Sequence, residues 1–342
     1  MNFVYIGRFQ PIHNGHMAII EKTTKMMKEN DSFTIIIGSA DQERTIRNPL
    51  TIEERKKTIE IATEGMPVKI DTINDSPYDY DEWIRQLAAK LFGYHCFWHH
   101  STFENITIVG MEGVEEYVKR LNNIVGKGTC KSIVFTEQDT NINIHSTKIR
   151  ENTDAWFNDL FMPTKVVDYL RSITPDFVDI IKNINKVADD YAKSCNVKYN
   201  TCFMTVDNVV YTADKVLLIR RKDNGKYAIP GGFAEPYQTM KQNALRELEE
   251  ETSLTLNDVI LDKEPILIDA PFRDPRSSKK VNLISMVYSW NCKNPDNVKA
   301  ADDAADAMWV DFKEISNMRP SEFHADHKKI ICKVLGINYF EV

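Results

Sequence analysis

A glycine pair followed by an acidic helix constrains this chain more than any other stretch. Residues 230–232 are Pro-Gly-Gly, and the segment 242–251 that follows has the composition of a helix. Within it, Glu247, Glu250 and Glu251 stand three or four positions apart or adjacent, so on a helix their carboxylates share one face. Carboxylates gathered on one face repel one another unless a cation lies among them. Because oxygen-rich sites suit Mg²⁺ or Mn²⁺, the pattern predicts a divalent metal site.

The residues around this acidic face support a metal site. Glu235, in the loop before the helix, is a candidate fourth ligand, and Ala244, Leu245 and Leu248 are expected to be buried on the other helical face. The alternative interpretation is a solvated acidic face, which is what most runs of charge are. Arg246 between the acids, and the glycine turn that directs the loop back toward them, favour the metal site.

This stretch resembles the Nudix box, whose pattern is Gly, five residues, Glu, seven residues, Arg-Glu, an apolar residue, any residue, Glu-Glu, any residue, Gly and an apolar residue. The positions that match are Gly232, Arg246, Glu247, Leu248, Glu250, Glu251 and Leu254. Two positions depart from the pattern, because Gln238 replaces the first Glu and Ser253 replaces the last Gly. We interpret Ser253 as the sign of a helix end that does not need glycine.

The Nudix resemblance implies a fold and a reaction for the second half of the chain. The fold is an α/β/α sandwich with a mixed sheet, from about residue 200 to the end of the sequence. The reaction is hydrolysis of a diphosphate by a water molecule that a metal ion activates. The resemblance places this metal on Glu250 and Glu251, with help from Glu247 and Glu235.

A loop with two arginines between prolines, residues 270–276, follows the box. It resembles the substrate loop of Nudix enzymes that act on ADP-ribose, which implies ADP-ribose contacts for Arg273 or Arg276, with Gly232 nearby. An ordinary polar loop is the alternative. His324 and His327 have a spacing that suits a metal, but no cysteine or acidic group completes a zinc site, so a packed C-terminal helix is favoured.

The N-terminal stretch predicts a phosphate-binding turn. A short apolar run at residues 3–6 leads into residues 7–16, GRFQPIHNGH, and then into a helical pattern. A turn between a strand and a helix presents free backbone N–H groups and the positive end of the helix dipole to an anion. His13 and His16 add side-chain donors. A lone histidine there is more often a structural cap, but two of them with paired glycines and Arg8 favour the anion site.

Segments of strand and helix composition alternate through the first 170 residues or so. The apolar runs 33–37 and 106–109 each end at a glycine, as does the first run at Gly7. This alternation predicts a doubly wound, Rossmann-like α/β sheet, whose ligands bind beyond the carboxyl ends of the strands. Ser146 and Thr147, at a predicted helix start, and Arg150, one turn further in, form a second phosphate-binding group on the opposite side from the histidines.

The first half resembles the nucleotidyltransferase superfamily with the His-x-Gly-His signature, and within it the archaeal-type nicotinamide mononucleotide adenylyltransferases. The resemblance rests on residues 7–16, on 47–51 with Glu54 and Arg55, and on 146–150, where His145 stands at a position that is usually Ser. It implies transfer of AMP from ATP to nicotinamide mononucleotide, which gives NAD and pyrophosphate. The residues that it assigns to ATP and its phosphates are Gly7, Arg8, His13, His16, Arg47, Ser146, Thr147 and Arg150.

The same resemblance assigns the acceptor nucleotide to Trp83 and Asn48. Trp83 matches the position that stacks on the nicotinamide ring, and a tryptophan face also suits a cationic pyridinium by cation–π attraction. The alternative for Trp83 is a core aromatic on an amphipathic helix. The reaction needs aligned phosphates and neutralised charge rather than an activated nucleophile, so arginines, histidines and Mg²⁺ suffice.

Length and composition set the remaining expectations. The 342 residues exceed what one core usually organises, so we expect a nucleotidyltransferase domain at 1–172, a helical linker at 173–198 and a Nudix domain at 199–342. The net charge of -7 argues against non-specific nucleic-acid binding. Without an apolar run of membrane-spanning length or a targeting segment, we expect a cytoplasmic protein with no membrane partner. The six scattered cysteines are expected to be buried thiols.

Taken together, the two halves resemble bifunctional enzymes in which an adenylyltransferase is fused to a Nudix ADP-ribose pyrophosphatase. The expected ligands are ATP, nicotinamide mononucleotide, NAD and ADP-ribose, with Mg²⁺ or Mn²⁺ at both sites. One rival is a Nudix half that only senses a ligand, with Gln238 and Ser253 as early erosion of the box. Another is a first half that takes a different phosphorylated acceptor. Whether the chain forms a homo-oligomer is left open.

Overall fold

The computed structural model describes the whole chain except residues 43, 46, 76–79, 98–102, 141–143, 145, 174–176, 197, 272 and 338–342. The chain divides into two compact units, Met1–Asn185 and Lys186–Val342. The division falls inside α8 (Phe177–Ser194), the helix that occupies most of the expected linker. The linker bounds of 173–198 stay a prediction.

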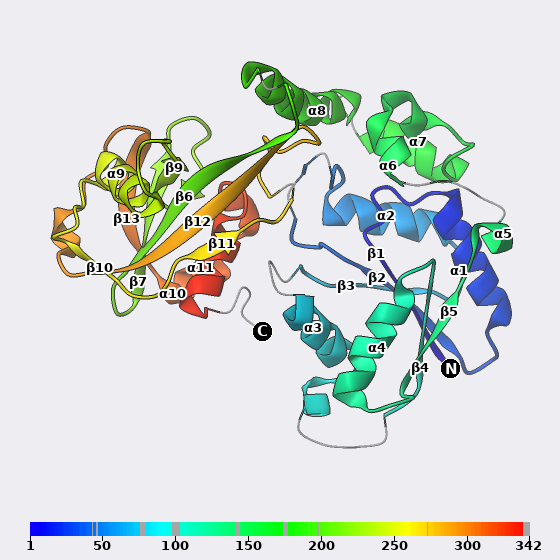
Figure 1. Cartoon of the computed structure of the whole chain (residues 1–342). Helices are drawn as coiled ribbons and strands as arrows, with labels where there is room; N and C mark the ends of the chain where they lie inside the picture. The colour runs from blue at the N-terminus through cyan, green and yellow to red at the C-terminus, as the bar shows by residue number, and fades with distance from the viewer. Residues whose placement is uncertain are drawn as a thin grey trace. The chain divides into compact units, whose positions relative to one another are not determined.

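A parallel sheet with the strand order β3-β2-β1-β4-β5 forms the centre of the first unit (Figure 1). Its strands are β1 (Asn2–Gly7), β2 (Ser32–Ile37), β3 (Lys69–Thr72), β4 (Ile106–Gly110) and β5 (Cys130–Val134). Each neighbouring pair is parallel. The chain runs outward from β1 on one side and returns to β4 on the other, so the strand order reverses between β1 and β4. In such sheets the ligand binds beyond the strand ends at this reversal.

Helices cover both faces of this sheet. Alternate residues of β1 enter different cores: Phe3 packs on the side of α1, whereas Val4 packs on the side of α3 and α4. This alternation buries the apolar strands on both faces, and the doubly wound fold predicted from the sequence is confirmed. The helices of this unit are α1 (Asn14–Met26), α2 (Ile52–Ala62), α3 (Tyr80–Phe92), α4 (Val114–Val125), α5 (Glu137–Thr140), α6 (Ser146–Glu151) and α7 (Thr164–Ile173), with short 3₁₀ turns at Tyr94–Phe97 and Thr153–Phe157.

A mixed sheet with the main order β10-β12-β6-β7-β13 forms the second unit. The short strands β11, β8 and β9 pair with β12, β7 and β6. The long central strands β6 and β12 are parallel, whereas β7 and β13 are antiparallel. The strands are β6 (Thr201–Tyr211), β7 (Lys215–Arg221), β8 (Tyr227–Ala228), β9 (Gly231–Phe233), β10 (Val259–Leu261), β11 (Ile266–Ile268), β12 (Val281–Cys292) and β13 (Ala304–Asp311).

Helices lie on both faces of this second sheet. Val206 and Val210 of β6 pack against α9 (Met240–Thr252), whose Leu248 lies in the same core. Asp207, on the opposite face of β6, lies 3.9 Å from His327 at the start of α11 (His327–Leu335). The expected α/β/α sandwich is therefore confirmed. The remaining elements are α10 (Phe312–Asn317) and the 3₁₀ turns Pro295–Asn297 and Pro320–Glu322.

The cysteines are free thiols, as expected, but they are not uniformly buried. Cys202 is exposed and Cys195 is partly exposed, which corrects that expectation. Within the described part of the chain, no helix combines the length and the apolar character needed to cross a bilayer.

Candidate functional site

His13 and His16 form the N-terminal cap of α1. Nδ1 of His13 accepts a hydrogen bond from Gly15 N–H (3.1 Å), and Nδ1 of His16 accepts one from His13 N–H (3.2 Å). A ring nitrogen that accepts a hydrogen bond carries no proton, so each neutral imidazole keeps its proton on Nε2. The cap therefore sets both tautomers and makes each Nε2–H group a donor.

The two imidazoles lie in close contact. Their ring centroids are 3.7 Å apart, and the planes are inclined by 27°. Burial, with the neighbouring His13 adding to it, lowers the pKa of His16 well below its ordinary value, so His16 is a neutral donor at physiological pH. A Cβ atom at Gly15 would lie 3.0 Å from the His13 ring, so glycine is required for this close fit.

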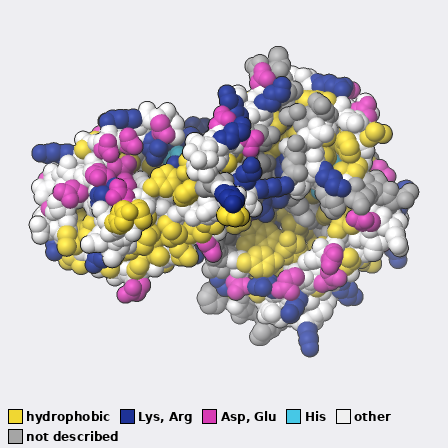
Figure 2. Space-filling model, turned by 45° about the horizontal axis from the view of Figure 1, so that its top comes forward, with side chains coloured by type: hydrophobic (Ala, Val, Ile, Leu, Met, Phe, Trp, Pro, Cys, Tyr) yellow, Lys and Arg dark blue, Asp and Glu magenta, His cyan; other side chains and the backbone are white. Residues whose placement is uncertain are grey.

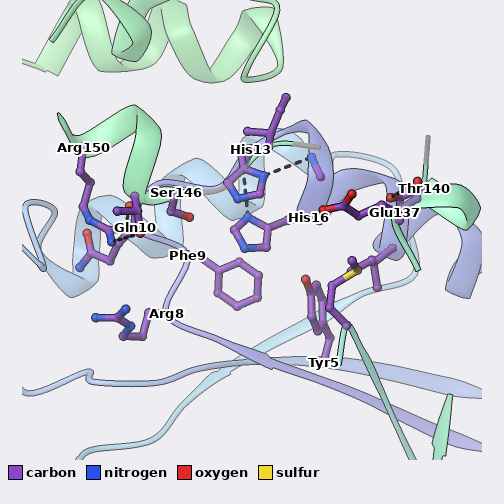
Figure 3. A pocket seen from close by; sticks show the side chains of 15 residues that line it. Tyr5, Arg8, Phe9, Gln10, His13, His16, Glu137, Thr140, Ser146 and Arg150 are labelled. Carbon is purple, nitrogen blue, oxygen red and sulfur yellow. Dashed lines mark hydrogen bonds between the residues drawn. The ribbon is translucent and has the colours of Figure 1, made fainter. Parts of the chain in front are cut away.

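Arginines gather beside the imidazoles. Burial, together with the charges of Arg47 and Arg150, lowers the pKa of Arg8 to about 10. Figure 3 shows Arg8 and Arg150 at one end of the pocket, the imidazoles in the middle and Glu137 at the other end. In the first unit, Lys and Arg side chains gather beside a hollow with apolar walls (Figure 2). Because these cations repel one another, the pocket favours an anionic ligand.

Gln10 connects the β1–α1 turn to two other segments that contribute to the site. Its side-chain amide donates to the Leu50 carbonyl and accepts from the Leu50 N–H, both at 2.9 Å. This clamp holds the loop that carries Asn48, whose Oδ1 accepts a hydrogen bond from Arg8 (3.4 Å). The Gln10 carbonyl accepts from Arg150 (2.9 Å). Gln10 lies in the signature, but nothing in the sequence showed that its partners stand on two distant segments.

Arg55 supports the backbone at the edge of the site. The sequence did not identify it as a functional residue. Its buried guanidinium donates to the carbonyls of Arg8 (3.0 Å), Gly38 (2.6 Å) and Ser39 (2.7 Å). These carbonyls follow the ends of β1 and β2. Burial lowers the pKa of Arg55 to about 10, and the charge of Asp75 opposes this shift. Arg55 thus joins two strand ends at the edge of the site.

The pocket lined by Arg8, His13, His16 and Arg150 has a volume of about 320 Å³. Ser146 and Thr147 of α6 contribute to its wall, and Thr147 Oγ1 accepts a hydrogen bond from Arg150 (3.0 Å). His145 lies outside the described residues. The pocket thus joins the β1–α1 turn to the start of α6, the two segments for which phosphate contacts are predicted.

Trp83 lies in an aromatic group at the start of α3. Its ring is parallel to Tyr80 (6.0 Å, 7°) and tilted against Tyr117 (5.5 Å, 47°), and it packs against the core below. Burial raises the pKa of Tyr117, and the charge of Arg8 opposes this rise. The stacking of Trp83 on nicotinamide stays a prediction.

The box helix α9 is capped at both ends. Thr239 and Gln242 form a capping box at its start. At its end, Ser253 has φ 62°, in the left-handed region. The interpretation that this helix end does not need glycine was therefore wrong, because Ser253 adopts the conformation that glycine takes most easily.

This strained serine gives a stability prediction. Ser253→Gly is expected to raise the free energy of unfolding of the second unit by about 0.5–1 kcal/mol, because glycine avoids the steric cost of the left-handed region. Chemical denaturation of the full-length protein, followed by tryptophan fluorescence, measures the change. Unchanged or lower stability would show that Ser253 carries no strain.

Arg246 pairs with two of the box carboxylates. Its Nη2 lies 2.8 Å from Glu247 Oε1, and its Nη1 lies 2.8 Å from Glu250 Oε2. Among the described residues, no group of three acidic, histidine or cysteine side chains has the spacing of metal ligands. Glu247, Glu250 and Glu251 are thus not assembled as one ligand set, and Arg246 pairs with both Glu247 and Glu250. The Glu235 side chain is exposed, and its backbone N–H donates to Asn243 (2.8 Å).

Glu251 and Glu247 nevertheless have the chemistry of metal ligands. Glu251 is 3% exposed, and its Oε2 accepts a hydrogen bond from Gly231 N–H (2.8 Å). Burial raises the pKa of Glu251 to about 8, opposed by this hydrogen bond and increased by Glu247. Burial also raises the pKa of Glu247, although Arg246 opposes it. Two partly desolvated carboxylates of this kind suit a hard divalent cation.

Gly232 lets one of these carboxylates approach the turn. A Cβ atom at this position would lie 2.5 Å from the Glu247 carboxylate. The absence of a side chain thus decides where Glu247 lies. Close packing against Glu247 therefore explains why glycine stands at position 232, whereas the expected contact of Gly232 with ADP-ribose stays a prediction.

The two loop arginines have different surroundings. Nε and Nη2 of Arg273 each lie 2.9 Å from the Asp326 carboxylate, and this pair is buried. Arg276 pairs with Asp274, but its side chain is 32% exposed and lies beside the rings of Tyr191 (5.7 Å) and Phe233 (5.5 Å). Arg276 is thus the arginine that a ligand can reach. Tyr191, on α8, had no signal in the sequence.

Comparison with known proteins gives a separate family match for each of the two units. Residues 203–334 match the family model of the NUDIX domain, and residues 4–152 match the Cytidylyltransferase-like family. An ADP-ribose pyrophosphatase of Methanocaldococcus jannaschii is 35% identical over 134 residues, which cover 37% of this chain and 70% of that protein. The chain belongs to the Nudix family. In the chain, its Nudix domain follows a cytidylyltransferase-like domain, as predicted.

Other relatives match the first unit or the whole chain. A nicotinamide-nucleotide adenylyltransferase of Picrophilus torridus is 40% identical over 95 residues, 26% of this chain and 52% of that protein. The matched stretch thus spans about half of that relative. A bifunctional NMN adenylyltransferase/ADP ribose pyrophosphatase of Francisella tularensis, solved with AMP and a manganese ion, is 25% identical with a TM-score of 0.72. The match covers 98% of each chain, so the predicted fold class, a Rossmann-like domain followed by a Nudix domain, is confirmed.

Proposed function

We propose that this Nudix-family chain is a bifunctional enzyme of NAD metabolism. Its first unit transfers AMP from ATP to nicotinamide mononucleotide, and its second unit hydrolyses ADP-ribose to AMP and ribose 5-phosphate. The observation that carries the proposal is the likeness, over 98% of both chains, to the bifunctional Francisella tularensis enzyme. The cationic pocket of the first unit and the box carboxylates of the second support it. We expect the protein to act in the cytoplasm.

In the first reaction, a phosphate oxygen of nicotinamide mononucleotide attacks the α-phosphorus of ATP. The bond from that phosphorus to the bridging oxygen breaks, and pyrophosphate leaves. The Nε2–H groups of His13 and His16 donate to the polyphosphate, and Arg8, Arg47 and Arg150 balance its charge. These groups act by alignment and charge stabilisation, so no covalent intermediate is needed. A divalent ion bound with the nucleotide supplies further charge neutralisation.

In the second reaction, water is added across the diphosphate of ADP-ribose. Glu247 and Glu251 would hold a divalent ion, with Glu250 and Glu235 as further candidates. Such an ion supplies Lewis acidity to the diphosphate and lowers the pKa of a bound water. The Gly231 N–H orients the Glu251 carboxylate.

Two contacts on this side bear on substrate binding. Arg276, partly exposed beside Phe233, can pair with a negative phosphate group of the substrate. Arg273 is held in the buried pair with Asp326, so we assign ADP-ribose binding to Arg276 first.

A substrate panel on the full-length protein tests the proposal. With Mg²⁺, chromatography should show NAD from ATP and nicotinamide mononucleotide, and AMP from ADP-ribose. Nicotinate mononucleotide and phosphopantetheine, offered in competition, should be poorer acceptors. Binding of ADP-ribose without AMP release would instead support the sensor alternative. Absence of both products would refute the proposal.

Gly15→Ala probes the packing of the first site. The new Cβ atom would lie 3.0 Å from the His13 ring, so the imidazole must shift. Because small misplacements of aligned groups are costly, we expect NAD formation to fall about ten-fold or more. Gly38→Ala is the matched control, because its Cβ atom would meet nothing closer than 3.8 Å. Equal rates for both variants would contradict the assigned role of the His13 ring.

A further inference from the structure

A three-residue segment links the C-terminal helix to the box. Residues 229–231 run from the end of β8 to the first residue of β9. At one end, Ile229 N–H donates to Nδ1 of His327 on α11 (3.0 Å). At the other, Gly231 N–H donates to Oε2 of Glu251 on α9 (2.8 Å). The imidazole and the carboxylate thus hold opposite ends of the same short piece of backbone.

This segment is held along its length. Pro230 has a restricted φ, and its carbonyl accepts from the backbone N–H (2.8 Å) and the side-chain amide (3.3 Å) of Asn208. A Cβ atom at Gly231 would lie 2.2 Å from the Val206 carbonyl, so the segment lies flat against β6. The backbone between Ile229 and Gly231 therefore has little conformational freedom.

His327 is fixed from its other side. Because Nδ1 accepts from Ile229, the proton of this buried imidazole stays on Nε2, which lies 3.9 Å from Asp207 Oδ1. Asp207 accepts a hydrogen bond from Ser285 and lies 3.6 Å from Arg273 Nη2. The imidazole thus has a set tautomer and a set position.

The sheet separates His327 from the metal-binding side. Asp207, which His327 approaches, faces away from α9, whereas Val206 and Val210 face toward it. Among the described residues, hydrogen bonds at the two ends of the segment 229–231 connect His327 to Glu251. We propose that His327 is a positioning residue that holds the Gly231 N–H in place for the Glu251 carboxylate and so sets metal affinity. This inference rests on the proposed role of Glu251 in holding a divalent ion.

The test uses two amide replacements that differ in where they place the acceptor. His327→Asn keeps an oxygen near the position of Nδ1, whereas His327→Gln moves it to the position of Nε2 and leaves Ile229 N–H without its acceptor. Manganese binding to the full-length protein is measured by electron paramagnetic resonance, with no substrate present. Loss of an outer support typically costs 10–100-fold in metal affinity, so we expect His327→Gln to bind Mn²⁺ about ten-fold more weakly. We expect His327→Asn to stay near the wild type.

Other outcomes overturn the inference. Wild-type affinity in both variants would mean that His327 does not act on the site. Equally weakened Mn²⁺ binding in both variants, or failure of both to fold, would mean that His327 has a merely structural role. Weakened Mn²⁺ binding in His327→Asn alone would be the opposite of the expected result and would also overturn the inference. Circular dichroism and thermal unfolding check that each variant is folded, and Lys333→Gln on the exposed side of α11 is the surface control. If the wild type itself does not bind Mn²⁺, or Glu251→Gln does not weaken binding, the proposed function of the site fails instead.

Discussion

Replacing His16 is expected to lower NAD formation about 10²–10³-fold, the usual cost of losing one preorganised donor to a charged transition state. His16 Nδ1 is used in the cap of α1, so only its Nε2–H is available to a ligand. The neutral imidazole does not depend on protonation to donate, because burial holds its pKa well below the ordinary value. The decrease should therefore appear in kcat, measured by coupled detection of NAD.

Two replacements separate the donor from the cap. His16→Ala removes both, whereas His16→Asn keeps an oxygen that can accept from His13 N–H and removes only the donor. We expect both variants to lose NAD formation and only His16→Ala to unfold at a lower temperature. ADP-ribose hydrolysis, in the other unit of the same molecule, should be unchanged. Near wild-type NAD formation by His16→Asn would contradict the account of this site.

Glu251→Gln is expected to lower AMP formation from ADP-ribose by at least about 100-fold. Loss of a residue that only supports a metal ligand costs up to about 100-fold, and loss of a direct ligand should cost at least as much. Glutamine cannot supply the negative charge that a divalent ion needs. It does keep an acceptor for Gly231 N–H, and it removes a carboxyl group whose pKa is raised to about 8 by burial. The variant should therefore unfold at the same temperature as the metal-free wild type or above it.

The matched control for this variant is Glu249→Gln. Glu249 is an exposed acid on the same helix that the box pattern does not use. Its replacement should leave both activities unchanged, and Glu251→Gln should leave NAD formation unchanged. Retention of ADP-ribose hydrolysis by Glu251→Gln, with metal still required, would show that the ion is held elsewhere.

The first site shows what a sequence can and cannot predict. The strand, turn and helix around residues 7–16 follow from apolar pattern and glycine placement, so the location of the anion site was predicted. The tautomers of His13 and His16 were not, because they depend on which backbone N–H each ring meets. The roles of Gln10 and Arg55 were also missed, since their partners are long-range: Gln10 binds Leu50, and Arg55 binds the carbonyl of Arg8.

The second site was predicted in position more than in detail. The helical spacing of the glutamates placed the box helix correctly, because periodicity is a local property. The pairing of Arg246 with Glu250 was not predicted, since side-chain partners are chosen by packing. In the sequence, Arg273 and Arg276 were equal candidates for ADP-ribose binding. Arg273 is paired with Asp326, which is 53 positions away and could not be foreseen as its partner. The left-handed backbone of Ser253 likewise had no signal in its residue type.

The central claim is that one chain builds two separate phosphoanhydride sites, a cationic one and a carboxylate one. Crystals of the full-length protein grown with Mn²⁺ and a non-hydrolysable ATP analogue test it most directly, through a manganese anomalous difference map. We predict a manganese peak at Glu247 and Glu251, and the triphosphate within hydrogen-bond distance of His13, His16 and Arg8. A box without manganese, or a triphosphate outside the histidine pocket, would contradict the account.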